Sequence, residues 1–341
     1  MTKTLALIAK TTITLALLYF SVSRAGLGLI AEHAEQLNPG WFLASVAVLS
    51  LQTLISAVRW RGIIRDCGAT ISLAQAARWT FMSLFFMQAL PSTIGGEAVR
   101  IWLAARDGAG WSKAIYSVAI DRLAGVAVLA AMVIICIPES FAVIHDPVAR
   151  LDIVILGLLG ISLPAVFVGL GRWHWAAAFK QARVLRHIEA AASLAYKIFS
   201  SPRPVLRITA LSLAVHCLTI LAAWLAAKSV AARFDLLHAA LLIPPVLLVM
   251  IAPISIAGWG VRESAMVMAF SYSGLSQTDG FLASVLFGFT TFATGMVGGL
   301  IWMIGARGRQ PILAGESSGI PEHAILRQPR GLPNDETILA P

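Results

Sequence analysis

Two ten-residue segments place charged residues and glycines inside otherwise apolar sequence. The first, PSTIGGEAVR, runs from Pro91 to Arg100, and the second, PISIAGWGVR, runs from Pro253 to Arg262. They share proline, isoleucine, glycine, valine and arginine at equivalent positions. An arginine guanidinium can donate two parallel hydrogen bonds to a phosphate or a carboxylate. The repeated pattern therefore favours two similar half-sites for an anionic group.

The residues around each arginine extend this chemistry. A helix broken by proline and glycine presents unpaired backbone N–H groups and the positive end of its dipole, and both attract anions. Glycine lets a backbone approach a ligand closely, and a glutamate can pair with the arginine or carry a proton. The alternative for the glutamates is helix capping, which is ordinary in a first turn. The candidate substrate-binding residues of the two segments are Gly95, Gly96, Glu97, Arg100, Gly258, Gly260, Arg262 and Glu263.

The composition indicates a membrane environment for these segments. Of the 341 residues, 58% are hydrophobic and only 13% are charged, and the mean hydropathy is +0.81. Soluble domains have about a quarter of their residues charged. We therefore predict an all-α integral membrane protein that crosses the bilayer several times.

The positive charge of the chain fits membrane lipids better than nucleic acid. The sequence has 26 Lys and Arg against 17 Asp and Glu, and the basic residues lie between apolar stretches. Basic loops set the orientation of membrane proteins and attract anionic lipid head groups. We expect membrane lipids, above all anionic ones, as partners and no nucleic acid, and the oligomeric state stays open.

The sequence contains no evident pattern for catalysis or metal binding. The three cysteines are scattered singly, and the seven histidines lack the spacing of metal ligands. No Ser/His or Cys/His constellation converges. We expect no metal, no cofactor and no enzymatic activity.

Six segments have the length and composition of a membrane span, which needs about 20 mostly apolar residues. They are residues 5–22, 41–58, 113–137, 151–170, 205–227 and 281–305. Residues 5–22 would also suit a signal peptide, but the duplication below requires a span there.

Two further apolar segments, residues 75–106 and 238–272, each contain one of the ten-residue segments. Their proline and glycine residues interrupt the helical pattern. A broken backbone at membrane depth is tolerated only inside protein or beside a watery cavity. We therefore predict two re-entrant helical hairpins.

The order of these elements indicates an internal duplication. Span, span, hairpin and span occur in that order twice, and the interval from Pro91 to Pro253 nearly equals the interval from Trp60 to Trp224. Because each unit has three crossings, the second unit should be inverted relative to the first. We place repeat 1 at residues 1–137, repeat 2 at residues 138–305 and a disordered tail at residues 306–341.

Asp121 and Arg122 lie inside the predicted span 113–137, where charged residues are rare and usually functional. Two interpretations stay open for them. The pair either locks this span against the first hairpin or lies along the path of a lipid. Both residues join the candidate substrate-binding residues.

The distribution of lysine and arginine predicts the orientation. Basic residues concentrate around Arg59, Arg61 and Arg65, after the first hairpin, between residues 172 and 207, and after the last span. The positive-inside rule then places both termini in the cytoplasm. Residues 173–200 combine regularly spaced apolar residues with a basic side, which predicts an interfacial helix, with a solvated linker helix as the alternative.

Three stretches carry a resemblance to a known family. FFMQALPSTIGGEAVRIWLAARDG, AIDRLAGVAVL and APISIAGWGVRE together resemble the transmembrane region of the lysylphosphatidylglycerol synthase family, also described as flippase-like. The resemblance covers roughly residues 5–305. The family pattern commonly has Asn in place of Gln88 and Asp in place of Glu97, and both changes keep the chemistry.

The resemblance implies a function in lipid translocation. Synthase members carry a large soluble transferase domain after the membrane part, and here only a short tail follows. We therefore expect a flippase-like protein of the cell membrane that moves an anionic phospholipid or a lipid-linked precursor between leaflets. The alternative is a membrane subunit or partner of a separately encoded lipid-modifying or glycosyl-transferring enzyme.

The first prediction concerns topology. In a cysteine-free background, a single cysteine at position 178 should react with a membrane-impermeant maleimide only after the cells are opened, because the loop of residues 172–207 is expected in the cytoplasm. Labelling in intact cells would contradict the inverted arrangement.

Overall fold

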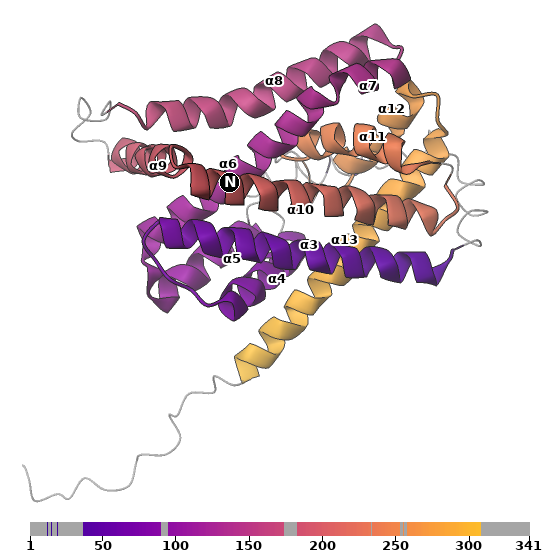
Figure 1. Ribbon diagram of the computed structural model, residues 1–341. Coiled ribbons are helices and arrows are strands. Elements are labelled where there is room, and N and C mark those ends of the chain that lie inside the picture. Colours follow the sequence, from indigo (N-terminus) through magenta and orange to yellow (C-terminus); the bar gives the residue numbers. More distant parts are fainter. Residues whose placement is uncertain are drawn as a thin grey trace, which may run out of the picture. The chain divides into compact units, whose positions relative to one another are not determined.

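The fold is seen in a computed structural model, which describes residues 37–89, 95–173, 183–232, 234–252, 255 and 258–307, with isolated positions at 12, 15 and 19. Every regular element among these residues is a helix (Figure 1), which confirms the predicted all-α fold class. Five helices are long and apolar enough to cross a membrane: α3 (Pro39–Asp66), α6 (Trp111–Ile135), α8 (Pro147–Leu170), α10 (Pro202–Lys228) and α13 (Gln277–Arg307).

These five helices match five of the six predicted spans; the sixth, residues 5–22, lies outside the described residues, as does most of the predicted tail. The described residues up to Trp302 make up one compact unit, which contains all but the last turn of α13. The shorter helices are α4 (Leu73–Ala89), α5 (Gly95–Ala104), the π-helical turn η1 (Ala105–Ala109), α7 (Ile137–Val143), α9 (Arg183–Phe199), α11 (Leu236–Val249) and α12 (Val261–Tyr272).

Both predicted hairpins consist of two short helices separated by a break. α4 packs against α5, and α11 packs against α12. The order of the helices also repeats, because α10, α11, α12 and α13 follow α3, α4, α5 and α6 at nearly constant intervals along the chain. Re-entry from one membrane face and the inverted relation of the two units stay predictions.

The helices begin where the sequence supplies a cap. The side chains of Asn38 and Asp146 accept hydrogen bonds from the backbone N–H groups of Gly40 and Ala149, and a proline follows each cap. Asp235 caps α11 in the same way, through the N–H of His238. This backbone bond, together with one from the His238 ring, holds the pKa of the Asp235 carboxyl below its usual value.

α3 and α10 form the main helix pair and are antiparallel. The N–H of Asn38, before α3, donates to the carbonyl of Ser229, after α10, at 2.7 Å. Within the pair, the Ser45 hydroxyl donates to the carbonyl of Ala222 at 2.7 Å and meets the Thr290 hydroxyl of α13 at 3.1 Å. Small and hydroxyl-bearing residues thus allow three long helices to approach closely, as is typical in membranes.

The helix of the second predicted span extends beyond residue 58, where the span was predicted to end. α3 continues to Asp66, so Arg59 lies inside the helix and not in a cytoplasmic loop. Its side chain is buried and paired with Asp121. The apolar stretch of the sequence stops at this charged residue, although an ion pair with another helix neutralises its charge.

One face of helix α9 packs on a cluster of buried residues. Its small residues Ala191, Ala192 and Ala195 are buried, and Ala195 belongs to a cluster with Ile63 of α3 and Ile120 of α6. Ile198 is buried with them, whereas Val184 and Ile188 stay exposed. The helix therefore packs on the bundle with one face and leaves another for the predicted interface; residues 174–182 lie outside the described part.

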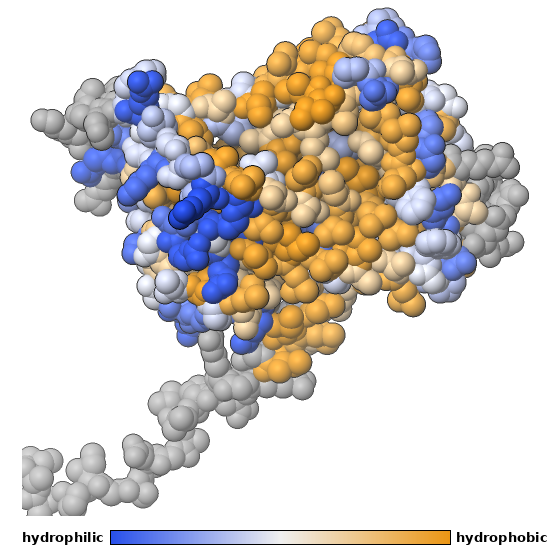
Figure 2. All heavy atoms as spheres, viewed as in Figure 1, coloured by the Kyte–Doolittle hydropathy of each residue, from blue (hydrophilic) through white to orange (hydrophobic). Residues whose placement is uncertain are grey.

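The surface agrees with a membrane environment. Figure 2 shows hydrophobic residues over the middle of the viewed face and hydrophilic residues gathered at its two sides. On α8, large apolar side chains point outward, including Leu158, Leu159 and Leu163, each more than half exposed. Such side chains need a lipid environment or another apolar partner.

The packing of α13 against α4 generates a second prediction. A Cβ added at Gly298 would collide with the backbone carbonyl of Phe81, so Gly298→Ala should destabilise the protein by about 1–3 kcal/mol. Gly169→Ala in α8 is the matched control, because a Cβ there meets nothing within 4 Å and alanine favours a helix by about 1 kcal/mol. Thermal unfolding in detergent measures both, and equal midpoints would refute the proposed close contact.

Candidate functional site

A chain of five charged side chains connects α3, α5 and α6. Asp121 accepts from Arg59 Nε at 2.8 Å and from Arg100 Nη1 at 3.1 Å. Arg100 Nη2 also donates to Glu97 at 2.6 Å, and the other Glu97 oxygen accepts from Arg122. Three cations and two carboxylates therefore alternate along one connected network.

Asp121 occupies the centre of this network and is buried. Its side chain is 3% exposed, and each of its two oxygens accepts from a different arginine. Arg59 also donates to the Ser212 hydroxyl of α10 at 3.0 Å. Of the two interpretations left open by the sequence, the structure supports the lock for Asp121, which joins the α6 span to the first hairpin and to α3.

A buried tryptophan supports Arg100 from the other side. The Arg100 guanidinium carbon lies 4.7 Å from the ring centroid of Trp60, in cation–π geometry. Trp60 is completely buried, and its indole N–H donates to the Ser117 hydroxyl at 3.2 Å. The arginine is thus held by two carboxylates and an aromatic face.

The second ten-residue segment builds a similar but smaller arrangement. Arg262 donates to Glu263 at 2.6 Å and to the Ser284 hydroxyl at 3.1 Å, and its guanidinium lies 4.7 Å from the ring of Trp259. Glu263 also accepts from the N–H of Gly260 at 2.6 Å. Both arginines therefore combine a glutamate, which the sequence offered as a partner, with a tryptophan, which it did not.

The two half-sites differ at one position, which is charged in the first half-site and neutral in the second. The interval from Arg100 to Arg262 nearly equals the interval from Asp121 to Ser284, the partner of Arg262 on α13. A neutral hydroxyl thus occupies the place of a carboxylate. In the second half-site, the arginine and the glutamate that neutralises it both belong to α12. In the first half-site, the paired charged side chains come from three helices.

Both half-sites line one cavity of about 360 Å³. Residues of both hairpins contribute to it, together with residues of α3, α6, α10 and α13. Its charged lining residues are Arg59, Glu97, Arg100, Asp121, Arg122 and Arg262. Its uncharged polar lining side chains are Gln52, Thr53, Ser56, Thr80, Ser83, Gln88, His216, Thr219 and Thr291.

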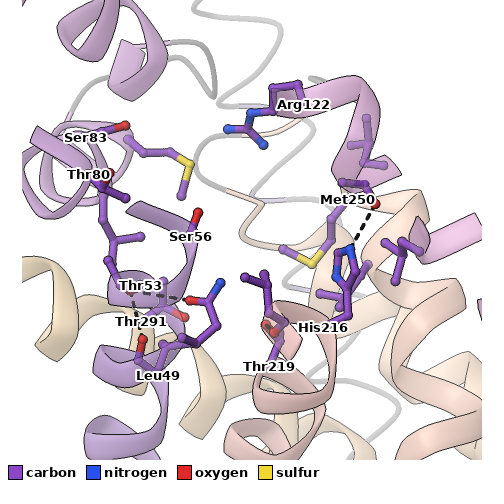
Figure 3. Close-up of a pocket in the computed structure, with 18 of the residues that line it drawn as sticks. Leu49, Thr53, Ser56, Thr80, Ser83, Arg122, His216, Thr219, Met250 and Thr291 are labelled. Carbon is purple, nitrogen blue, oxygen red and sulfur yellow. Dashed lines mark hydrogen bonds between the residues drawn. The ribbon is translucent and has the colours of Figure 1, made fainter. Parts of the chain in front are cut away.

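Arg122 is the accessible cation of this cavity. Its side chain is 53% exposed, whereas those of Arg100 and Arg262 are 4% and 5% exposed. Figure 3 shows Arg122 extending toward the space between Ser56 on one side and Met250 on the other. Arg122 therefore has room for a further partner, which the two buried arginines lack.

The predicted site residues divide into two groups. Glu97, Arg100, Asp121, Arg122 and Arg262 line the cavity. The other five are absent from the described lining: Gly95, Gly96, Gly258, Gly260 and Glu263.

Three of the predicted glycines are required by helix packing or by the backbone conformation of a turn. Gly96 is packed so closely on the Ser83 carbonyl of α4 that no Cβ would fit between them. Gly258 and Gly260 have φ angles of 80° and 83°, which favour glycine before α12. The described geometry thus assigns these three glycines to packing and turning. The sequence analysis expected these glycines to let the backbone approach a ligand. At Gly96, the group that requires a glycine is instead the backbone of a neighbouring helix.

The structure adds residues that the sequence did not reveal as part of the site. Arg59 looked like a loop residue, and Ser284 is an ordinary hydroxyl in an apolar span. His216 Nε2 donates to the Gly125 carbonyl of α6 at 2.9 Å and so ties α10 to the cavity wall. Only the shared repeat offset of Asp121 and Ser284 could have indicated the serine.

Comparison with known proteins gives one family match. The family model described as "Lysylphosphatidylglycerol synthase TM region" matches residues 7–299 of the chain. The match includes every cavity residue described above, and it agrees with the resemblance carried by the three sequence stretches. No curated protein matches the sequence.

The buried network generates a third prediction. Asp121→Asn should destabilise the protein by about 3–5 kcal/mol, because it leaves Arg59 and Arg100 without their shared carboxylate in a buried place. Asp152→Asn on the exposed surface of α8 is the matched control and should change stability little. Chemical unfolding in detergent measures both. Equal stability of the two variants would mean that the network does not hold the helices together.

Proposed function

The chain belongs to the family of the lysylphosphatidylglycerol synthase transmembrane region, and we propose that it moves an anionic phospholipid or lipid-linked precursor between the two leaflets of the cell membrane. The proposal treats the protein as a transporter without enzymatic activity of its own. It includes the orientation expected from the basic loops, with both termini in the cytoplasm.

The observation that carries this proposal is the position of Arg122. A half-exposed guanidinium extends into a cavity that is lined by polar and apolar side chains and includes helices apolar enough to span a membrane. A charged residue within a membrane-spanning helix is costly, so such residues are retained mainly for function. A lipid phosphate is the anionic group most abundant in this environment, and arginine suits its oxygens.

The two hairpins supply a means of alternating access. Secondary transporters commonly bind their substrate between broken helices from two repeated halves, near the middle of the membrane. Here the broken elements α4–α5 and α11–α12 both line the same cavity. A relative movement of the halves would expose the Arg122 side chain to one leaflet and then to the other.

A fourth prediction tests this proposal. Arg122→Gln should lower leaflet exchange of a labelled phosphatidylglycerol in proteoliposomes by at least about tenfold, because one charge-assisted contact contributes on the order of 1.5–3 kcal/mol. Arg122→Lys should restore part of the exchange, since lysine keeps the charge and loses the bidentate fork. The exposed Arg203, outside the cavity, is the matched control for both changes.

The same assay separates transport from the rival role. Wild-type protein that binds the labelled lipid and never changes its leaflet would favour a partner of a separately encoded lipid-modifying enzyme. Equal exchange by wild type and Arg122→Gln, with equal amounts of folded protein, would remove Arg122 from the path of the lipid.

A further inference from the structure

We propose that the cavity selects lipids whose head group is a phosphodiester with a single net negative charge, and that Glu97 sets this selection. The inference rests on the proposed function and names the substrate class of the same site. It excludes zwitterionic head groups and doubly charged phosphomonoesters as preferred cargo.

The charge of the cavity is the first step. In the first half-site, Arg59, Arg100 and Arg122 stand against Glu97 and Asp121, which leaves one positive charge. In the second half-site, Arg262 is balanced by Glu263. Glu263 lies behind the described lining, whose own charged side chains are four arginines and two carboxylates; with Glu263 included and His216 counted as neutral, the site has a net charge of one positive unit.

An unbalanced charge in the occupied cavity has a free-energy cost. A head group that fills the cavity displaces water from the half-exposed Arg122, and charges out of water are stable only when they are paired. A phosphodiester brings one negative charge and neutralises the cavity. A phosphomonoester brings about 1.5–2 negative charges at neutral pH and leaves a negative excess, while a zwitterionic head group leaves the positive excess in place.

Glu97 is the side chain that controls this charge balance. The Asp121 side chain is 3% exposed, and its charge is already shared by two buried arginines. The Glu97 side chain is 15% exposed and shares Arg122 with any arriving phosphate. A second negative charge on that phosphate would therefore lie next to the Glu97 carboxylate, where like charges repel.

The phosphodiester could belong to a glycerophospholipid or to a prenyl-linked sugar, and both have a natural monoester counterpart. The experiment therefore uses two pairs of probes. One pair is phosphatidylglycerol and phosphatidic acid, and the other is a polyprenyl phosphoryl sugar and polyprenyl phosphate. Phosphatidylethanolamine serves as the zwitterion. Competition between probes for the full chain in detergent, measured by native mass spectrometry at neutral pH, gives the binding ratios.

The wild-type protein should prefer the diester in each pair, by at least about tenfold, which corresponds to about 1.4 kcal/mol. Glu97→Gln raises the cavity charge by one unit and should shift the diester-to-monoester ratio toward the monoester by at least about tenfold. Arg122→Gln lowers it by one unit and should remove the preference for phosphatidylglycerol over phosphatidylethanolamine. The matched controls are Glu139→Gln and Arg203→Gln, which make the same changes on exposed side chains outside the cavity.

Each outcome bears on one claim. An unchanged diester-to-monoester ratio in folded Glu97→Gln overturns the inference, while wild-type binding of anionic lipid would leave the proposed function intact. A wild type that binds no anionic lipid overturns the proposed function itself. If Glu97→Gln does not fold, as thermal unfolding would reveal, Arg122→Gln decides, and a retained preference over phosphatidylethanolamine overturns the inference.

Discussion

One buried carboxylate determines how the first half of the cavity is assembled. Asp121 accepts from Arg59 of α3 and from Arg100 of α5 while its own backbone belongs to the α6 span. Neither arginine could be placed at this depth without a partner, because an uncompensated buried charge costs several kcal/mol. Asp121 thus joins α5, and with it Glu97, to α3 and α6, in addition to the packing of α5 on α4.

The adjacent residue shows how one helix serves two purposes. Successive residues on an α-helix point about 100° apart, since a turn contains about 3.6 residues. Asp121 consequently faces α3 and α5, whereas Arg122 extends into the cavity, where it keeps one contact with Glu97. The two interpretations that the sequence left open for this pair are not exclusive: the buried ion pairs of Asp121 support the lock, and the exposure of Arg122 leaves the lipid path as a proposal for that residue.

Much of the fold could be predicted from the sequence, because membrane spans depend on length and apolarity alone. Five spans and both broken segments were found in this way. The end of α3 was missed because the apolar pattern stops at Arg59, and hydropathy does not register a partner on a distant helix. For the same reason, the sequence identified Arg100 and Arg262 as candidates without revealing that both are buried and already paired with carboxylates, and Arg122 stood out only once its exposure was known.

The two half-sites share a sequence pattern but differ in what holds them in place. Separation of α5 from α6 would break the ion pairs of Arg100 with Asp121 and of Glu97 with Arg122. Separation of α12 from α13 would break the hydrogen bonds of the Ser284 hydroxyl, because the Arg262–Glu263 pair stays within α12. Breaking a buried ion pair costs about 3–5 kcal/mol, and hydrogen bonds to charged groups contribute about 1.5–3 kcal/mol each. The substitution of a hydroxyl for a carboxylate thus places the hydrogen bonds of Ser284 where the first hairpin has an ion pair, beside apolar contacts such as that of Phe270 with Gly280, while the first hairpin is fixed around the cation that faces the cavity.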